Sequence, residues 1–283
     1  GFSQRWIDTY AGHSGESPIL EPLYDYAAKE EYRLSIPDDR IGLELYARGS
    51  MLVLWNTQPR LDWQTPEYYA SESAVLTPNE FQRMHRNQWV TSAEVFVPAE
   101  WWDGCQGEYP AFDERLSVVI GMDAGVSSDC FALVGVSRIG ETTYVRFCRV
   151  WKPPKGGKID FGEVERCIRD ELVKQYNVIQ IAYDPYQTHD LATRLRGDGV
   201  TWMYEFTQGA PRLEADKQLY DCIRDKRIVH NGDALLREHV TNANSKSEGD
   251  VDKLRIVKRA EHLKIDATVA LSMANSEIRR LNV

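Results

Sequence analysis

From Leu116 to its C-terminus the chain alternates short, apolar, β-rich runs with helical segments, and this rhythm limits the folds open to it. Strand patterns cover residues 116–123, 130–138 and 142–152, and short turns join them into a meander. Helices and strands then alternate, with strands at 178–184 and 201–206 and helices at 160–176, 188–195, 213–224 and 262–281. This order predicts an α/β domain built on a mixed sheet flanked by helices.

The first hundred residues follow a different pattern. Helical segments are separated by proline-marked breaks, and Thr65 and Thr77 each stand before a proline as predicted helix N-caps. Residues 40–56 predict a hairpin that turns at 48–50. We therefore expect a mainly helical part over 1–102, a linker over 103–115 and the α/β domain over 116–283. The aromatics of residues 100–115 are expected to be exposed.

Composition narrows the class of protein. With 283 residues, 42% apolar and 27% charged, the chain is typical of a folded soluble protein. No apolar run approaches the roughly 18 residues that span a bilayer, so no membrane association is expected. The five cysteines are widely spaced and form no CxxC, which indicates reduced thiols. A net charge of −9 argues against a general nucleic-acid coat protein, but a nuclease needs an acidic centre of its own.

Three aspartates stand at the margins of the predicted core. Asp123 and Asp184 each end an apolar strand, and ligands of open α/β sheets bind at that edge. Asp266 falls in the first turn of the last helix. Each also has an ordinary interpretation: a turn aspartate satisfied by backbone N–H groups, or an acid that stabilises a helix dipole.

Brought together, these carboxylates would repel one another unless cations with a preference for oxygen ligands held them, such as Mg²⁺ or Mn²⁺. A centre of two such ions suits phosphodiester hydrolysis. The catalytic and metal-binding candidates are therefore Asp123, Asp184 and Asp266. His189 is either an acid or water-orienting group at this site or an ordinary surface residue, and Asp129 either caps the turn after Asp123 or joins the metal site.

Basic residues gather in two runs, Lys152–Lys158 and Lys253–Lys264. Each is either a solvated surface run or a contact to DNA backbone phosphates. The DNA-binding candidates are Lys253, Arg255, Lys258 and Arg259.

Three segments, MDAGVSSD, AYDPYQTHDLATRL and LKIDATVALSMA, resemble in order and spacing the nuclease domain of the large subunit of tailed-bacteriophage terminases. Upstream, WIDTYAGHSGES resembles the segment that closes the packaging ATPase of that family, and PNEFQRMHRNQWV resembles the stretch between ATPase and nuclease. The resemblance implies a ribonuclease H-like (RuvC-like) fold with Asp123, Asp184 and Asp266 as metal ligands. It also matches Asp129 to an acid of the first motif and Lys264 to a basic position near the scissile phosphate.

The same resemblance implies a metal-dependent endonuclease that cuts concatemeric double-stranded DNA with two Mg²⁺ or Mn²⁺ ions. Its partners would be duplex DNA, the small terminase subunit and the portal protein, in the cytoplasm of the host cell. The sequence contains no GxxxxGK[ST] motif, so we expect no ATPase activity from this chain and interpret residues 1–102 as the end of an ATPase domain.

Three alternatives stay open. GMDAGVSSD also resembles the phosphate turn of sugar kinases and actin-like ATPases, although no second such turn follows. Other ribonuclease H-like nucleases and resolvases share the acidic site. The third is a non-catalytic docking module of a packaging machine, although such a module has no need for three acids at core margins.

Overall fold

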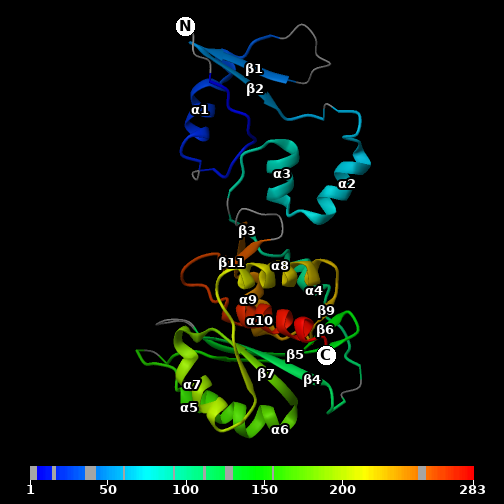
Figure 1. Ribbon diagram of the computed structural model, residues 1–283, viewed down its shortest axis with the longest axis vertical. Helices are drawn as coiled ribbons and strands as arrows, with labels where there is room; N and C mark the ends of the chain where they lie inside the picture. The colour runs from blue at the N-terminus through cyan, green and yellow to red at the C-terminus, as the bar shows by residue number, and fades with distance from the viewer. Residues whose placement is uncertain are drawn as a thin grey trace. The chain divides into compact units, whose positions relative to one another are not determined.

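The computed structural model describes residues 5–14, 17–35, 43–59, 61–91, 93–110, 113–124, 130–154, 156–247 and 253–283. The chain divides into two compact units, Gly1–Glu94 and Val95–Val283, and Figure 1 labels most of their helices and strands. Among the described helices, none has the length and apolar character needed to cross a membrane.

The first unit combines short helices with a hairpin. Its elements are α1 (Leu20–Ala27), a 3₁₀ turn (Glu30–Tyr32), β1 (Leu43–Arg48), β2 (Met51–Asn56), α2 (Pro66–Val75) and α3 (Pro78–Arg86). The predicted hairpin and both predicted caps are confirmed: the Thr65 and Thr77 side chains accept hydrogen bonds from backbone N–H groups of their own helices.

The two N-terminal segments that resemble terminases meet in this unit. The Ala11 N–H donates to Asn87 Oδ1 at 2.7 Å, and the Ser14 N–H donates to the Val90 carbonyl, also at 2.7 Å. Trp55 of β2 lies beside them, because its indole N–H donates to the Asn87 carbonyl at 3.1 Å. Segments about 75 residues apart in the chain therefore form one small core.

The second unit contains a six-stranded sheet and two helical layers. Strand β3 (Ala93–Val95) spans the boundary between the units. The further elements, in chain order, are α4 (Ala99–Asp103), β4 (Ser117–Ala124), β5 (Phe131–Ile139), β6 (Thr142–Trp151), α5 (Phe161–Arg166), a π-helical turn (Cys167–Leu172), α6 (Val173–Gln175), β7 (Asn177–Tyr183), α7 (Pro185–Gly197), β8 (Trp202–Glu205), α8 (Ala210–Arg224), β9 (Ile228–Val229), α9 (Ala234–Thr241), β10 (Ala243–Ser247), β11 (Leu254–Lys258) and α10 (Asp266–Leu281).

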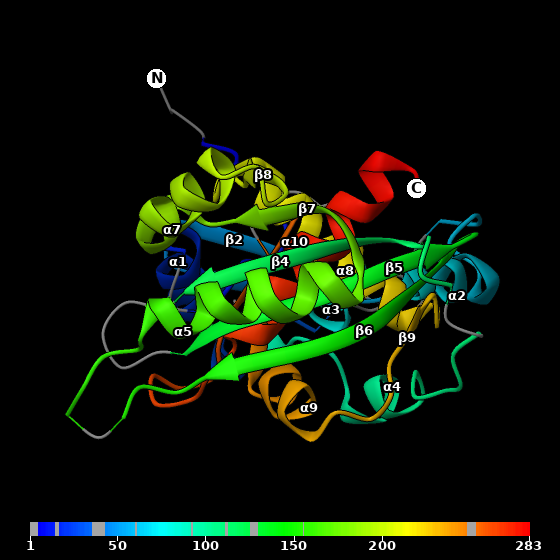
Figure 2. The same ribbon diagram turned by 90° about the horizontal axis from the view of Figure 1, so that it is seen from below.

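The sheet has the strand order β8-β7-β4-β5-β6-β9. Strands β4, β5 and β6 form the predicted antiparallel meander, whereas β7 pairs parallel to β4 and β8 parallel to β7. Helices α5, α6 and α7 cover one face, and α8, α9 and α10 lie on the other (Figures 1 and 2). Because side chains alternate along a strand, β4 supplies one apolar set to each layer. The predicted mixed α/β sheet with flanking helices is confirmed.

Helix starts are where the sequence-based prediction fails most. Helix α7 begins at Pro185, not near Thr188, because Asp184-Pro185 is itself a cap followed by a first-turn proline. Helix α10 begins at Asp266, not at His262. The aromatics after Ala99 are not all exposed, since Trp102 of α4 is completely buried.

Candidate metal centre

Asp123 is the next-to-last residue of β4, and Asp184 is the first residue after β7, its parallel neighbour. Met122 of β4 pairs with Tyr183 of β7, and the Asp184 N–H donates to the Met122 carbonyl at 3.4 Å. The two aspartates are therefore the next facing positions at one sheet edge, on strands that lie about 4.8 Å apart. Both are partly exposed. The Asp184 side chain caps α7, because its Oδ1 accepts a hydrogen bond from the Tyr186 N–H at 3.0 Å.

Strand alternation places both aspartates on the face covered by α10. On β4, Val119 belongs to the core under α8–α10, and Gly121 lies so close to α10 that a Cβ there would stand 1.8 Å from the Ala270 carbonyl oxygen. Asp123 is two residues further and so has the same orientation. On β7, Gln180 donates to Glu277 of α10 at 2.7 Å, and Asp184 shares its parity.

The direction of α10 brings Asp266 to the same edge. The far end of the helix is fixed at the opposite edge, where Asn275 accepts a hydrogen bond from the Thr143 hydroxyl and Arg279 donates to the Glu141 carbonyl in the β5–β6 turn. From Ala270 back to Asp266 is one helical turn, about 6 Å, and from Gly121 to Asp123 is about 6.7 Å along the strand. Asp266, of which only 3% is exposed, therefore lies level with the strand ends.

A buried arginine adds positive charge behind this edge. Arg212 of α8 forms an ion pair with Asp216 at 2.7 Å and donates to Gln208 Oε1 at 2.9 Å. Burial opposes the charge of Arg212, but attraction to Asp216, and more weakly to Asp123 and Asp184, raises its pKa. The two site aspartates therefore share one internal cation within electrostatic reach.

Asp216 ties this arginine to the neighbouring elements. Its Oδ2 accepts a hydrogen bond from the Ile256 N–H of β11 at 2.9 Å, and its Oδ1 accepts one from the Ser272 hydroxyl of α10. One completely buried carboxylate therefore holds α8, α10 and β11 together.

The donor set fits a hard divalent cation in kind, because all three predicted ligands are carboxylates. Within the described residues, however, no three His, Cys, Asp or Glu side chains stand in an arrangement that could already hold an ion. Asp129, the predicted additional acid, lies outside the described residues. The structure thus brings the end of β4 and the starts of α7 and α10 to one edge of the sheet. It does not define how the three carboxylates would be arranged around a bound cation.

The two further candidates, His189 and Lys264, differ in how far they are exposed to solvent. His189 is exposed on α7, one turn beyond Asp184. Lys264 precedes α10 with a partly exposed side chain, and its carbonyl accepts a hydrogen bond from Asn242 at 3.1 Å. Each therefore lies within five residues of a predicted metal ligand in the chain, His189 of Asp184 and Lys264 of Asp266.

The predicted DNA-binding run is not an irregular surface segment. Residues 254–258 form β11, paired antiparallel with β10, and alternation buries Leu254 and Ile256. Arg255 points the other way, faces Lys246 across the pair and donates to the Gln208 carbonyl at 2.7 Å. Lys253 and Lys258 flank it partly exposed, and Arg259 is exposed. Gln208 thus joins this basic strand to Arg212.

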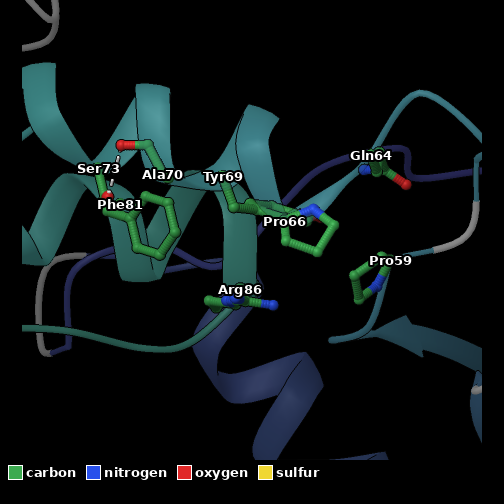
Figure 3. Close-up of a pocket in the computed structure, with 8 residues that line it drawn as sticks. All are labelled: Pro59, Gln64, Pro66, Tyr69, Ala70, Ser73, Phe81 and Arg86. Carbon is green, nitrogen blue, oxygen red and sulfur yellow. Dashed lines mark hydrogen bonds between the residues drawn. The ribbon is translucent and has the colours of Figure 1, made fainter.

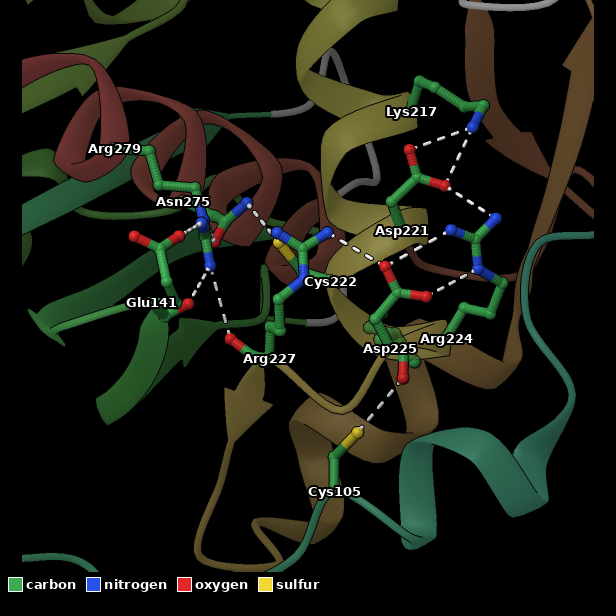
Figure 4. A network of polar contacts seen from close by, with 11 residues as sticks. Cys105, Glu141, Lys217, Asp221, Cys222, Arg224, Asp225, Arg227, Asn275 and Arg279 are labelled. Atoms are coloured by element: carbon green, nitrogen blue, oxygen red, sulfur yellow. Dashed lines mark hydrogen bonds and ion pairs between the residues drawn. The ribbon is translucent and has the colours of Figure 1, made fainter. Parts of the chain in front are cut away.

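Sequence reasoning missed α9 and the side chains around Asp216. An Arg and an Asp four residues apart on a helix indicate an ion pair, but nothing in their spacing reveals that the pair is buried. A second polar network (Figure 4) joins Lys217, Asp221, Arg224, Asp225 and Arg227 of the α8 region and reaches Glu141 and Arg279. It belongs to the edge opposite Asp123 and is structural.

The first unit contains a pocket between α2 and α3 (Figure 3). Its lining includes Tyr69, Phe81 and Arg86, whose guanidinium lies 4.4 Å from the Tyr69 ring centroid. None of the predicted metal ligands lines it, and we assign it no function.

Comparisons with known proteins agree with this architecture. Residues 149–281 match the family described as terminase large subunit, endonuclease domain. The gene 13 protein of Mycobacterium phage D29 is 25% identical over an alignment 317 positions long. The alignment covers 95% of this chain and 50% of that protein. The chain thus spans about half the length of this curated relative.

Solved structures show the same fold. The large terminase of bacteriophage HK97 superposes with a TM-score of 0.58 at 19% identity, covering 76% of this chain and 51% of that one. The large terminase nuclease of thermophilic phage G20c, solved with bound magnesium, gives 0.50 at 11% identity, covering 65% and 97%.

The second unit therefore has the ribonuclease H-like fold of terminase nuclease domains. The resemblance to the large subunit of phage terminases, predicted from the sequence, is confirmed.

Proposed function

We propose that this chain carries the nuclease of a viral genome-packaging motor and cuts double-stranded DNA in a metal-dependent reaction. One observation carries the proposal: Asp123 and Asp184 lie side by side at the C-terminal ends of adjacent parallel strands, on the face where α10 presents Asp266. The match to the terminase endonuclease family and the magnesium in the G20c nuclease structure support it.

In this proposal Asp123, Asp184 and Asp266 hold two Mg²⁺ or Mn²⁺ ions. Like charges keep the three carboxylates apart until cations draw them together. Bound ions would supply an activated water and stabilise the leaving oxygen of the phosphodiester. Asp184 is fixed for this role by capping α7, and Asp123 by the sheet. His189 and Lys264 would approach the substrate from α7 and from the segment before α10.

Duplex DNA would lie across the basic strand β11. Lys253, Lys258 and Arg259 would contact backbone phosphates, which gives affinity with little sequence preference. Arg255 would take part only in addition to its hydrogen bond to the Gln208 carbonyl. Cations bound by the three aspartates would offset the repulsion between the DNA phosphates and these carboxylates.

The proposal also covers the domain boundaries, the substrate and the partners. Residues 1–102 would be the end of an ATPase domain and a connecting subdomain, 103–115 a linker and 116–283 the nuclease domain. The substrate would be concatemeric viral DNA in the cytoplasm of the host cell, and the partners the small terminase subunit and the portal protein.

Cleavage of supercoiled plasmid tests the proposal. The chain should nick and linearise plasmid with Mn²⁺ or Mg²⁺ and not with EDTA, and Asp184→Asn should abolish both products. Asparagine is as good a helix cap as aspartate, so the variant should fold. Asp190→Asn, at an exposed acid of the same helix, is the matched control and should cut like the parent. Equal cleavage by Asp184→Asn and parent would refute the proposed site.

A further inference from the structure

Helix α10, which carries the proposed ligand Asp266, has no side-chain cap of its own. The residue before it is Ile265, whose apolar side chain accepts no hydrogen bond. The first backbone N–H groups of a helix have no partner within the helix, so a buried start needs an acceptor from elsewhere. Asp266 itself is buried, so water cannot serve as that acceptor.

The acceptor comes from α9. His239 Nδ1 accepts a hydrogen bond from the Ala267 N–H at 3.0 Å. Asn242, just after α9, donates its side-chain N–H to the Lys264 carbonyl at 3.1 Å. The end of α9 therefore holds the backbone on both sides of Asp266 through two side chains.

The chemistry of His239 favours this function over simple packing. The ring is completely buried, and an accepting Nδ1 puts the proton of the neutral ring on Nε2. Among the described residues, Nε2 finds no hydrogen-bond partner. An apolar side chain would fill the same space without burying that polar group, so the contribution specific to histidine is its Nδ1 acceptor.

The ring also stays in its accepting form near neutral pH. The pKa of His239 is lowered to about 4, mainly by burial; the positive charges of Lys152 and Lys264 add to this shift, and Glu238 opposes it. Geometry and protonation thus agree that Nδ1 accepts the Ala267 N–H throughout the ordinary working range.

We propose that His239 is a positioning residue of the metal centre, which holds the first turn of α10 so that Asp266 reaches the cation together with Asp123 and Asp184. The inference rests on the proposed function. Groups that orient a metal ligand typically change metal affinity by about 10–100-fold when they are removed. Loss of the Nδ1 acceptor should therefore lower the affinity for the cation while the protein still folds.

A matched pair of substitutions separates the acceptor from the bulk. His239→Asn places an amide oxygen near the position of Nδ1, whereas His239→Gln places it near Nε2. We expect His239→Gln to bind Mn²⁺ at least about tenfold more weakly by calorimetry, and His239→Asn to stay within about twofold of the parent. Cleavage by His239→Gln should recover as Mn²⁺ is raised, because the ligands themselves are intact.

Equal Mn²⁺ affinity in the Asn and Gln variants, whether both unchanged or both reduced, would overturn the inference and make His239 a packing residue. If His239→Gln does not fold, His239→Leu supplies the same comparison with His239→Asn. Asp184→Asn runs alongside: if it binds Mn²⁺ as tightly as the parent, the proposed function itself fails. If it loses binding while His239→Gln keeps it, only the role of His239 fails.

Discussion

Asp123 lies close to groups of both charge signs at the end of β4. It lies beside Asp184, and Arg212 is the buried cation behind both. We expect Asp123→Asn to lose metal-dependent plasmid cleavage while its thermal midpoint without metal stays equal to or above that of the parent, because repulsion between carboxylates falls. Loss of folding in this variant would instead make Asp123 a structural turn aspartate.

Gly121 has a requirement that can be tested without any assay of function. A Cβ at this position would stand 1.8 Å from the Ala270 carbonyl oxygen, so Gly121→Ala must push α10 off the sheet. We expect a loss of about 1–3 kcal/mol or more in the free energy of unfolding, measured by urea denaturation.

Gly197, in the last turn of α7, is the matched control for this substitution, since nothing lies within 4 Å of its added Cβ. Gly197→Ala should be neutral or stabilise the protein by up to about 1 kcal/mol. Equal effects of the two substitutions would mean that α10 does not depend on the close approach at Gly121.

At the scale of elements, Asp216 joins α8, α10 and β11. Removing one partner of a buried ion pair leaves the other charge buried, so Asp216→Ala should lower the free energy of unfolding by about 3–5 kcal/mol. Arg194→Ala, which breaks a half-exposed pair with Glu165, should cost less than about 1 kcal/mol. Comparable losses in urea denaturation would contradict the placement of the Arg212–Asp216 pair in the core.

Elements also show what the sequence could predict. The strands that end at Asp123 and Asp184 were predictable because buried strands read as continuous apolar runs between turn residues. The start of α10 was not, because its cap is His239, contributed by a helix 28 residues upstream. No local pattern marks a side chain that becomes an acceptor only through tertiary packing.

The basic run at 253–258 illustrates the same limit. Its alternation of Leu254 and Ile256 with polar residues is the pattern of a half-buried strand. Its charge, however, indicated only a solvated surface run or a contact to DNA phosphates. Only the pairing with β10 shows that Arg255 faces Lys246. The three predicted metal ligands remain a prediction at the level of side-chain geometry.

The stability of the whole molecule should depend on pH, because two buried histidines are neutral in the folded protein. Burial lowers the pKa of His230 below its ordinary value and that of His239 to about 4. The unfolded chain binds these protons near pH 6.5, before the folded chain does, so stability present above 6.5 is lost as the pH falls toward 4. Thermal midpoints should fall over this window, and less steeply in His239→Asn. An unchanged slope in that variant would show that His239 does not titrate as a buried group.

The central claim is that aspartates from β4, the start of α7 and the start of α10 form one cation site. The most direct measurement is calorimetric titration of Mn²⁺ into the parent chain, Asp123→Asn, Asp184→Asn, Asp266→Asn and the control Asp190→Asn. We expect saturable binding in the parent and the control, and a loss of that binding in each of the other three. Folded parent protein that binds no Mn²⁺, or undiminished binding in the three variants, would contradict it.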